Sequence, residues 1–198
     1  MPDAFSITRM HDETTQAWHE PRGRIESETE DLSSVILAQH RANFDLWHEE
    51  DKARDPEATD HEIAEVKRSI DRLNQRRNDL VEKIDTELLR SLEEGLRSDT
   101  DTPLHSETPG MMIDRLSILA LKIFHTREES TRETATDAHR QRNGERLTLL
   151  EEQRSDLAQA LDALFRDLTE GRRRFKLYRQ MKMYNDPELN PVVYKSKG

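Results

Sequence analysis

The stretch NFDLWHEEDKAR, residues 43–54, holds the densest group of side chains that could do chemistry. Its carboxylates can bind a metal ion or exchange protons, its imidazole can carry a proton near neutral pH, and its guanidinium can bind an anion. If residues 31–54 form a helix, one face of that helix carries a stripe of seven side chains: Leu32, Ile36, His40, Asn43, Trp47, Asp51 and Arg54. This stripe is apolar in its first half and polar in its second half.

The polar half of the stripe has two interpretations. If it stays buried, its groups need partners, because an unpaired buried polar group costs roughly 1–3 kcal/mol, and a ligand site is then predicted. Alternatively, the helix leaves the core beyond Asn43, and Trp47 alone anchors it. Asp51 and Arg54 then form an ion pair between residues three apart.

Two further segments carry polar groups at helical spacing. Within residues 67–85, Asn and Asp recur on one stripe beside the apolar positions. These residue types are poor helix formers, so their recurrence predicts hydrogen bonds to a ligand or to a neighbouring helix. In the apolar run IDRLSILALKIF, residues 113–124, Asp114 requires a charge partner, which we expect to be Arg54, Arg77 or Arg115. His125, directly after this run, is predicted to be either a histidine packed between helices or a ligand-binding residue.

Together these segments give the candidate ligand-binding residues: Asn43, Trp47, His48, Glu50, Asp51, Arg54, Asp71, Asn74, Arg77, Asn78, Asp114 and His125. In this hypothesis the arginines contact an anion. The carboxylates at positions 50, 51 and 114 bind a metal ion or hydroxyl groups, or act as acid and base, and His48 carries a proton. No catalytic residue, metal or cofactor follows from spacing, and one divalent ion held by some of these carboxylates and His48 is left open.

Two other places could hold an anion. A helix starting after Thr108 leaves free backbone N–H groups near Gly110, although Glu107 beside them disfavours a strongly anionic occupant. In the basic segment 172–182, Arg179 and Lys182 are anion-binding candidates. Alternatively, these cations only stabilise the end of the preceding helix.

The elements that must position these groups are helices. Apolar residues at spacings of three and four predict an all-α fold, an elongated bundle of four main helices with a short N-terminal helix and an extended C-terminal tail. We expect helices over 6–20 with Ser6 as N-cap, over 31–54 ended by Pro56, from Pro56 or Asp60 to about 94, from Pro109, and over 131–170. Gly144 marks a bend or the true start of the last helix, and Gly171 its C-cap.

The domain organisation expected from these elements is one domain over residues 1–198. Residues 30–170 form the bundle and 171–198 a basic, Tyr-rich C-terminal segment in which Val192, Val193 and Tyr194 pack back. The dipeptide WH occurs at 18–19 and again at 47–48, which is too short to indicate a repeat.

Composition excludes several classes of function. The net charge of −10 disfavours nucleic-acid binding, which needs basic surface to displace counterions. The chain has no cysteine, which excludes disulfides, thiolate catalysis and Cys-type zinc sites. Without an apolar leader or a membrane-length apolar stretch, we expect no membrane span and a cytoplasmic protein.

Four segments carry a resemblance to a known family: NFDLWHEEDKAR, KRSIDRLNQRRND, SETPGMMIDRLSILALKIFH and YRQMKMYNDPELNPVVY. Over residues 10–194 the chain resembles a bacterial family called domain of unknown function 4254. TPGMMIDRLSILALK and LWHEED also look like segments of an uncharacterised family seen near polysaccharide-assembly genes. The resemblance implies a bacterial helical protein encoded near glycosyltransferases of the lipopolysaccharide type, and it supplies no catalytic residues.

Three functions are compatible with these features. The first is a buried polar site that binds an anionic or sugar-containing ligand in envelope glycan synthesis. The second is a non-catalytic accessory or scaffold protein that docks on a glycosyltransferase or associates with itself as a homo-oligomer. The third is a metal-dependent hydrolase, so the sequence leaves open whether the protein is an enzyme.

Overall fold

The computed structural model describes residues 2–21, 31–93, 101–181 and 188–189. They form five helices: α1 (Ala4–His19), α2 (Leu32–Lys52), α3 (Asp60–Glu93), α4 (Pro109–Thr131) and α5 (Asp137–Thr169). The only β-structure in these ranges is an isolated bridge between Leu104 and Arg174. The predicted all-α bundle of four long helices and a short N-terminal helix is therefore confirmed. Val192, Val193 and Tyr194 lie outside the described residues.

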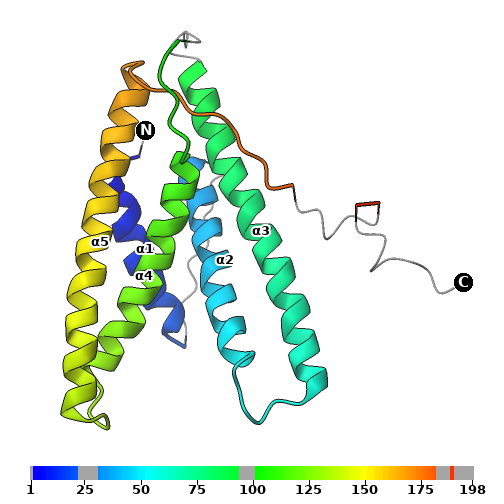
Figure 1. Cartoon of the computed structure of the whole chain (residues 1–198), viewed down its shortest axis with the longest axis vertical. Coiled ribbons are helices and arrows are strands. Elements are labelled where there is room, and N and C mark those ends of the chain that lie inside the picture. The colour runs from blue at the N-terminus through cyan, green and yellow to red at the C-terminus, as the bar shows by residue number, and fades with distance from the viewer. Residues whose placement is uncertain (1, 22–30, 94–100, 182–187, 190–198) are drawn as a thin grey trace, which may run out of the picture.

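Two helical hairpins make up the bundle. Helix α2 packs on α3, helix α4 packs on α5, and α1 lies behind α4, where it contacts α2, α4 and α5 (Figure 1). A continuous apolar core joins all five helices where α2 and α4 begin and where α3 and α5 end. Away from that end the two hairpins diverge (Figure 1). The polar residues discussed below lie where the apolar core gives way to this divergence.

Local side-chain chemistry sets the helix starts. Asp31 caps α2, and Thr108 caps α4 with Pro109 at the first helical position, as expected. The prediction of Ser6 as the first N-cap is wrong, because the Asp3 carboxylate accepts a hydrogen bond from the Ser6 N–H at 2.8 Å and starts α1 earlier. The predicted start of the last helix at 131 is also wrong. Thr136 caps α5 after a turn that ends α4.

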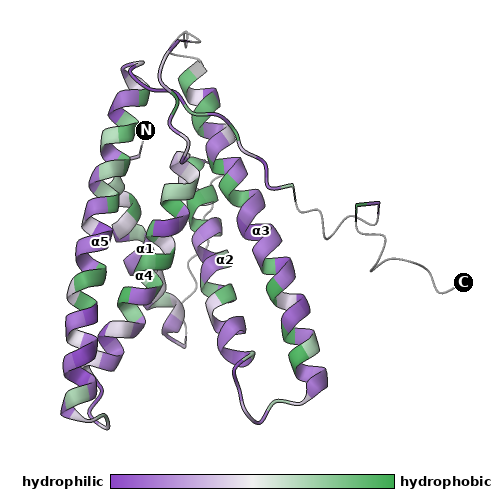
Figure 2. Cartoon of the chain, in the orientation of Figure 1, coloured by the Kyte–Doolittle hydropathy of each residue, from purple (hydrophilic) through white to green (hydrophobic). Residues whose placement is uncertain are grey.

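Gly171 ends α5 in the way that the sequence predicts. Its φ of 69° places it in the left-handed region, and the Arg172 N–H reaches back to the Asp167 carbonyl oxygen at 2.8 Å. Residues 175–181 form no helix, and Phe175 is buried in the core. Figure 2 shows that hydrophilic residues cover much of α3 and α5, and the buried apolar residues near the C-terminal ends of both helices belong to the core. No helix among the described residues is both long and apolar enough to cross a membrane.

Candidate functional site

Asp114 of α4 is the centre of a polar network between helices. One oxygen of its carboxylate accepts hydrogen bonds from the Gln39 side-chain amide at 2.6 Å and from the Asn43 amide at 2.8 Å. The Arg77 guanidinium of α3 lies 4.0 Å away. Of the three arginines expected to pair with Asp114, the structure selects Arg77, while Arg115 pairs with Glu107 instead. The network ties α2, α3 and α4 together.

A chain of hydrogen bonds runs from the Asp114 carboxylate to α1. The Asn43 amide also donates to the Ser117 hydroxyl at 2.9 Å, and that hydroxyl lies 2.7 Å from His40 Nδ1. His40 Nε2 lies 3.1 Å from the His11 carbonyl oxygen, which can only accept, so Nε2 carries the hydrogen. Nδ1 therefore accepts from Ser117, and a neutral imidazole satisfies every contact.

Burial sets the protonation of this network. It lowers the pKa of His40 to about 3 and raises the pKa of Asp114, which hydrogen bonding by Asn43 and the charge of Arg77 partly oppose. A neutral His40 also agrees with the hydrogen bonds around its ring. Two acceptors, Gln39 Oε1 and Asn43 Oδ1, remain buried without a hydrogen-bond partner.

The low pKa of His40 makes stability depend on pH. The unfolded imidazole, with a pKa of 6.5, takes up a proton at pH 5 while the folded one does not, so acid favours unfolding. At pH 5 the expected cost is about 2 kcal/mol. In urea unfolding, His40→Gln should be less stable than wild type at pH 7.5, and this gap should narrow by about that amount at pH 5. A gap that is constant with pH would contradict a neutral buried His40.

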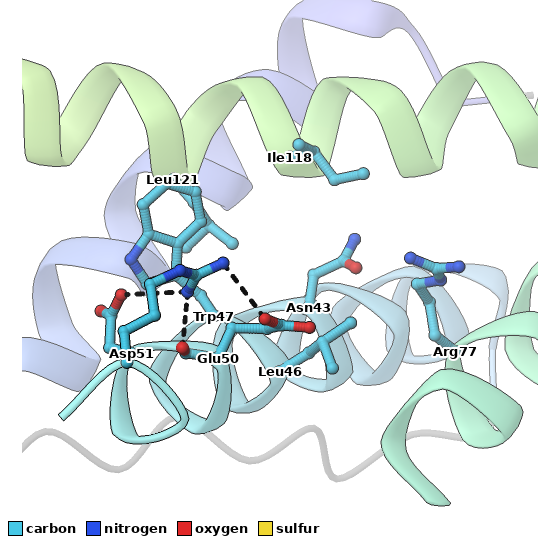
Figure 3. A pocket seen from close by; sticks show the side chains of 9 residues that line it. Asn43, Leu46, Trp47, Glu50, Asp51, Arg77, Ile118 and Leu121 are labelled. Atoms are coloured by element: carbon cyan, nitrogen blue, oxygen red, sulfur yellow. Dashed lines mark hydrogen bonds and ion pairs between the residues drawn. The ribbon is translucent and has the colours of Figure 1, made fainter. Parts of the chain in front are cut away.

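A cleft opens beside the network, between α2, α3 and α4. Its volume is about 400 Å³, and Figure 3 shows the side chains that line it: Asn43, Leu46, Trp47, Glu50, Asp51, Arg54, Arg77, Ile118 and Leu121. The stripe defined above supplies four of them, Asn43, Trp47, Asp51 and Arg54. Asn43 is buried, whereas the side chains of Asp51 and Arg54 are 61% and 66% exposed and lie 3.8 Å apart, so the helix leaves the core along the stripe as the second interpretation predicts. The ligand site stays a prediction.

The charges on the rim of the cleft are already paired. The Arg54 guanidinium donates to the Glu50 carbonyl oxygen and, at 3.2 Å, to its carboxylate, and it lies 3.8 Å from the Asp51 carboxylate (Figure 3). At the inner end, Arg77 donates to the Asn78 side chain at 3.2 Å, and its Nε is buried without a hydrogen bond. The cleft therefore presents acceptors at the rim and a donor inside.

Several predicted site residues do not reach this cleft. Asp71 is exposed and pairs with Lys67 on the outer face of α3, and Asn74 is half-buried outside the cleft lining. Asn78 is buried beside Arg77. The structure does not gather His48 with the carboxylates at 50, 51 and 114 as one metal-ligand set within the described residues.

At both predicted anion-binding places, groups of the protein itself already pair with donors or cations. The Gly110 N–H at the start of α4 donates to the Asp85 carboxylate of α3 at 2.7 Å, so a side chain of the protein itself fills that place. In the basic segment, Arg172 and Arg173 pair with acids at the end of α5. Arg179 is exposed, and Lys182 lies outside the described residues.

Three histidines form a second group. His19 of α1, His48 of α2 and His125 of α4 place one ring nitrogen each within 4.8 Å of the others, and all three are half-buried. Burial lowers the pKa of His48, and the neighbouring rings of His19 and His125 lower it further. The candidate residues chosen from the sequence did not include His19. The sequence feature that could have identified it is the WH dipeptide, which contains His19 in its first copy and His48 in its second.

Other members of the network were missed as well. They share burial between helices that are distant in sequence: His11, Thr15, Gln39 and Ser117. Of these, only Ser117 is marked by its local sequence, as a polar residue inside the apolar run 113–124.

Comparisons with known proteins support a family assignment. No curated protein and no solved structure matches the chain. A family model described as a protein of unknown function, DUF4254, matches residues 33–177. The match includes the segments at 43–54, 67–79 and 106–125, and it ends before the fourth resembling segment at 178–194. The chain belongs to the DUF4254 family, and all residues that line the cleft lie inside the matched region.

Proposed function

We propose that the cleft between α2, α3 and α4 binds a small ligand that carries both hydroxyl groups and an anionic group, such as a sugar phosphate. The volume of about 400 Å³ is in the range of small-molecule sites. The apolar walls come from Trp47, Ile118 and Leu121, and the polar groups converge from α2 and α3.

One observation carries this proposal: a buried acceptor and a buried donor are both unsatisfied in the same cleft. Asn43 Oδ1 and Arg77 Nε have no hydrogen-bond partner, and both residues line the cavity. In Figure 3 the two side chains point toward α4 from neighbouring positions. An unsatisfied buried polar atom costs roughly 1–3 kcal/mol. A ligand with a hydroxyl donor and an anionic acceptor satisfies both atoms.

The rim extends the same chemistry. The carboxylates of Glu50 and Asp51 accept hydrogen bonds from ligand hydroxyl groups, and the Arg54 guanidinium adds a second cation near an anionic group. His48 does not line the cleft, so it is not proposed as a proton carrier for this ligand.

The resemblance to a family expected near envelope glycan synthesis motivates sugar phosphates and nucleotide sugars as probes. We propose binding here and assign no reaction. The accessory-protein alternative predicts that none of these compounds binds.

We expect glucose 1-phosphate or a uridine diphosphate sugar to raise the thermal unfolding temperature of the protein. Asp51→Ala should weaken the binding of that compound about tenfold in isothermal titration calorimetry, because a hydrogen bond to a charged group is lost. The substitution should leave folding intact, since the Asp51 side chain is 61% exposed.

Asp71→Ala is the matched control. Asp71 also belongs to an exposed ion pair on a helix, but it lies outside the cleft, so its loss should leave binding unchanged. Inorganic phosphate alone tests whether the sugar contributes to binding. If no compound of the panel shifts the unfolding temperature, or if both variants bind alike, the cleft is not the site and the accessory-protein interpretation gains support.

A further inference from the structure

Three imidazoles from three different helices converge on one point beside the core. We propose that His19, His48 and His125 form a binding site for a divalent transition-metal ion of the Zn²⁺ type. This inference is independent of the ligand proposed for the cleft, and it goes beyond that function.

The spacing of the rings agrees with a shared ion. Zinc–nitrogen bonds of about 2.0–2.1 Å in tetrahedral geometry place ligand nitrogens about 3.4 Å apart and the centres of their rings about 5.2 Å apart. The ring centroids of His19 lie 5.2 Å from His48 and 5.0 Å from His125, and the third separation is 5.9 Å. The rings cross at 71°, 78° and 88°, so they converge edge-on and do not stack. The ring nitrogens lie within 4.8 Å of one another, so binding a shared ion requires them to move closer together.

Hydrogen bonding leaves two of the rings with a free lone pair. His19 Nδ1 lies 2.7 Å from the Thr15 carbonyl oxygen, and His125 Nδ1 lies 3.0 Å from the Glu128 carboxylate. Because these oxygens accept, Nδ1 carries the hydrogen in both rings, and in the neutral form of each ring Nε2 offers a lone pair. Both Nε2 atoms are buried without a hydrogen-bond partner. A histidine that ligates a metal ordinarily donates its other N–H to a carbonyl or carboxylate oxygen in this way.

Aromatic side chains hold these rings in place. Phe124 stacks on His19 with centroids 4.3 Å apart, and Trp47 stacks on His125 with planes 10° apart. Phe44 contacts the third ring edge-on at 4.5 Å. These contacts restrict the imidazoles, so little ordering is required when an ion binds.

The ligand set selects the class of metal. Three neutral imidazole nitrogens without a carboxylate suit Zn²⁺, Co²⁺, Ni²⁺ or Cu²⁺, whereas Mg²⁺ and Ca²⁺ require oxygen ligands. Three protein ligands leave a fourth position in a tetrahedral shell. Trp47 both lines the cleft and stacks on His125, so it lies between the proposed ion and the ligand site.

The test is metal binding by untagged full-length protein after chelator treatment. We expect one equivalent of Zn²⁺ per chain by isothermal titration calorimetry and elemental analysis, with no response to Mg²⁺. His48→Ala should weaken zinc binding at least 100-fold. His61→Ala, at an exposed position of α3, is the matched control and should bind as wild type does. Glu128→Gln should weaken binding roughly tenfold or more, since it alters the acceptor that orients His125.

A second measurement on the wild-type protein covers the case in which His48→Ala fails to fold. The chain has eight histidines, whose ring nitrogens can be followed in long-range ¹H–¹⁵N spectra. If zinc is bound directly through nitrogen, adding zinc should shift the ring signals of His19, His48 and His125. The proposal is overturned if wild-type protein binds no Zn²⁺, if folded His48→Ala binds with unchanged affinity, or if other imidazoles shift instead. None of these outcomes contradicts the proposed binding of a ligand in the cleft, because the test of that binding uses no metal ion.

Discussion

Replacing Asp114 by alanine is expected to lower the free energy of unfolding by about 4 kcal/mol, because removing one partner of a buried pair leaves the other without compensation. The carboxylate accepts from Gln39 and Asn43 and compensates the charge of Arg77. Its side chain is 18% exposed and that of Arg77 is 23% exposed, so water replaces these partners poorly. Urea unfolding at pH 7.5 measures the loss.

Asp114→Asn separates the hydrogen bonds from the charge. Gln39 and Asn43 donate to the same carboxylate oxygen, which the asparagine carbonyl can replace. Asparagine does not compensate the charge of Arg77, so its expected loss is smaller than that of Asp114→Ala only by the contribution of the two hydrogen bonds, about 2 kcal/mol. Adding Arg77→Met to Asp114→Ala should recover part of the stability, because the uncompensated charge is then gone. If Asp114→Ala were as stable as wild type, the network would not hold the helices together.

Replacing Gly110 by alanine is expected to destabilise the protein by about 3 kcal/mol, although alanine is the better helix former. A Cβ at this position would lie 2.8 Å from the Val81 carbonyl oxygen and 2.8 Å from the Asp85 carboxylate. The backbone oxygen cannot move alone, so α3 and α4 must separate. The Gly110 N–H would then lose its 2.7 Å hydrogen bond to Asp85. Chemical denaturation measures the change.

Gly144→Ala is the matched control for this prediction. Gly144 lies inside α5, and nothing lies within 4 Å of an added Cβ. This substitution should stabilise the protein by roughly 0.5–1 kcal/mol, the ordinary gain of alanine over glycine in a helix. Equal effects at both positions would show that α3 and α4 are not in close contact at Gly110.

Local chain chemistry made much of the fold predictable. Thr108 and Pro109 start α4, and Gly171 ends α5, because caps and glycine conformations depend on neighbouring residues. The errors have the same origin. Asp3 and Thr136 competed with nearby polar residues for the capping positions, and the sequence does not rank such competitors.

The α2 stripe shows how far periodicity leads toward the site. It predicted correctly that the stripe is apolar and then polar on one face of the helix, and the structure places Asn43, Trp47 and Asp51 in one cleft. It did not show where the neighbouring helices end their contact with that face. The divergence of the two hairpins decides that Asn43 is buried and Asp51 exposed.

The sequence by itself determined the helical class, most of the helix ends and the apolar-to-polar stripe of α2, because these follow from side chains within a few turns. The tertiary structure decided which arginine pairs with Asp114, that Gly110 contacts Asp85, and that His19 joins His48 and His125. Each of these contacts joins helices through their packing angle and register. Those quantities depend on the whole core, so no local pattern encodes them.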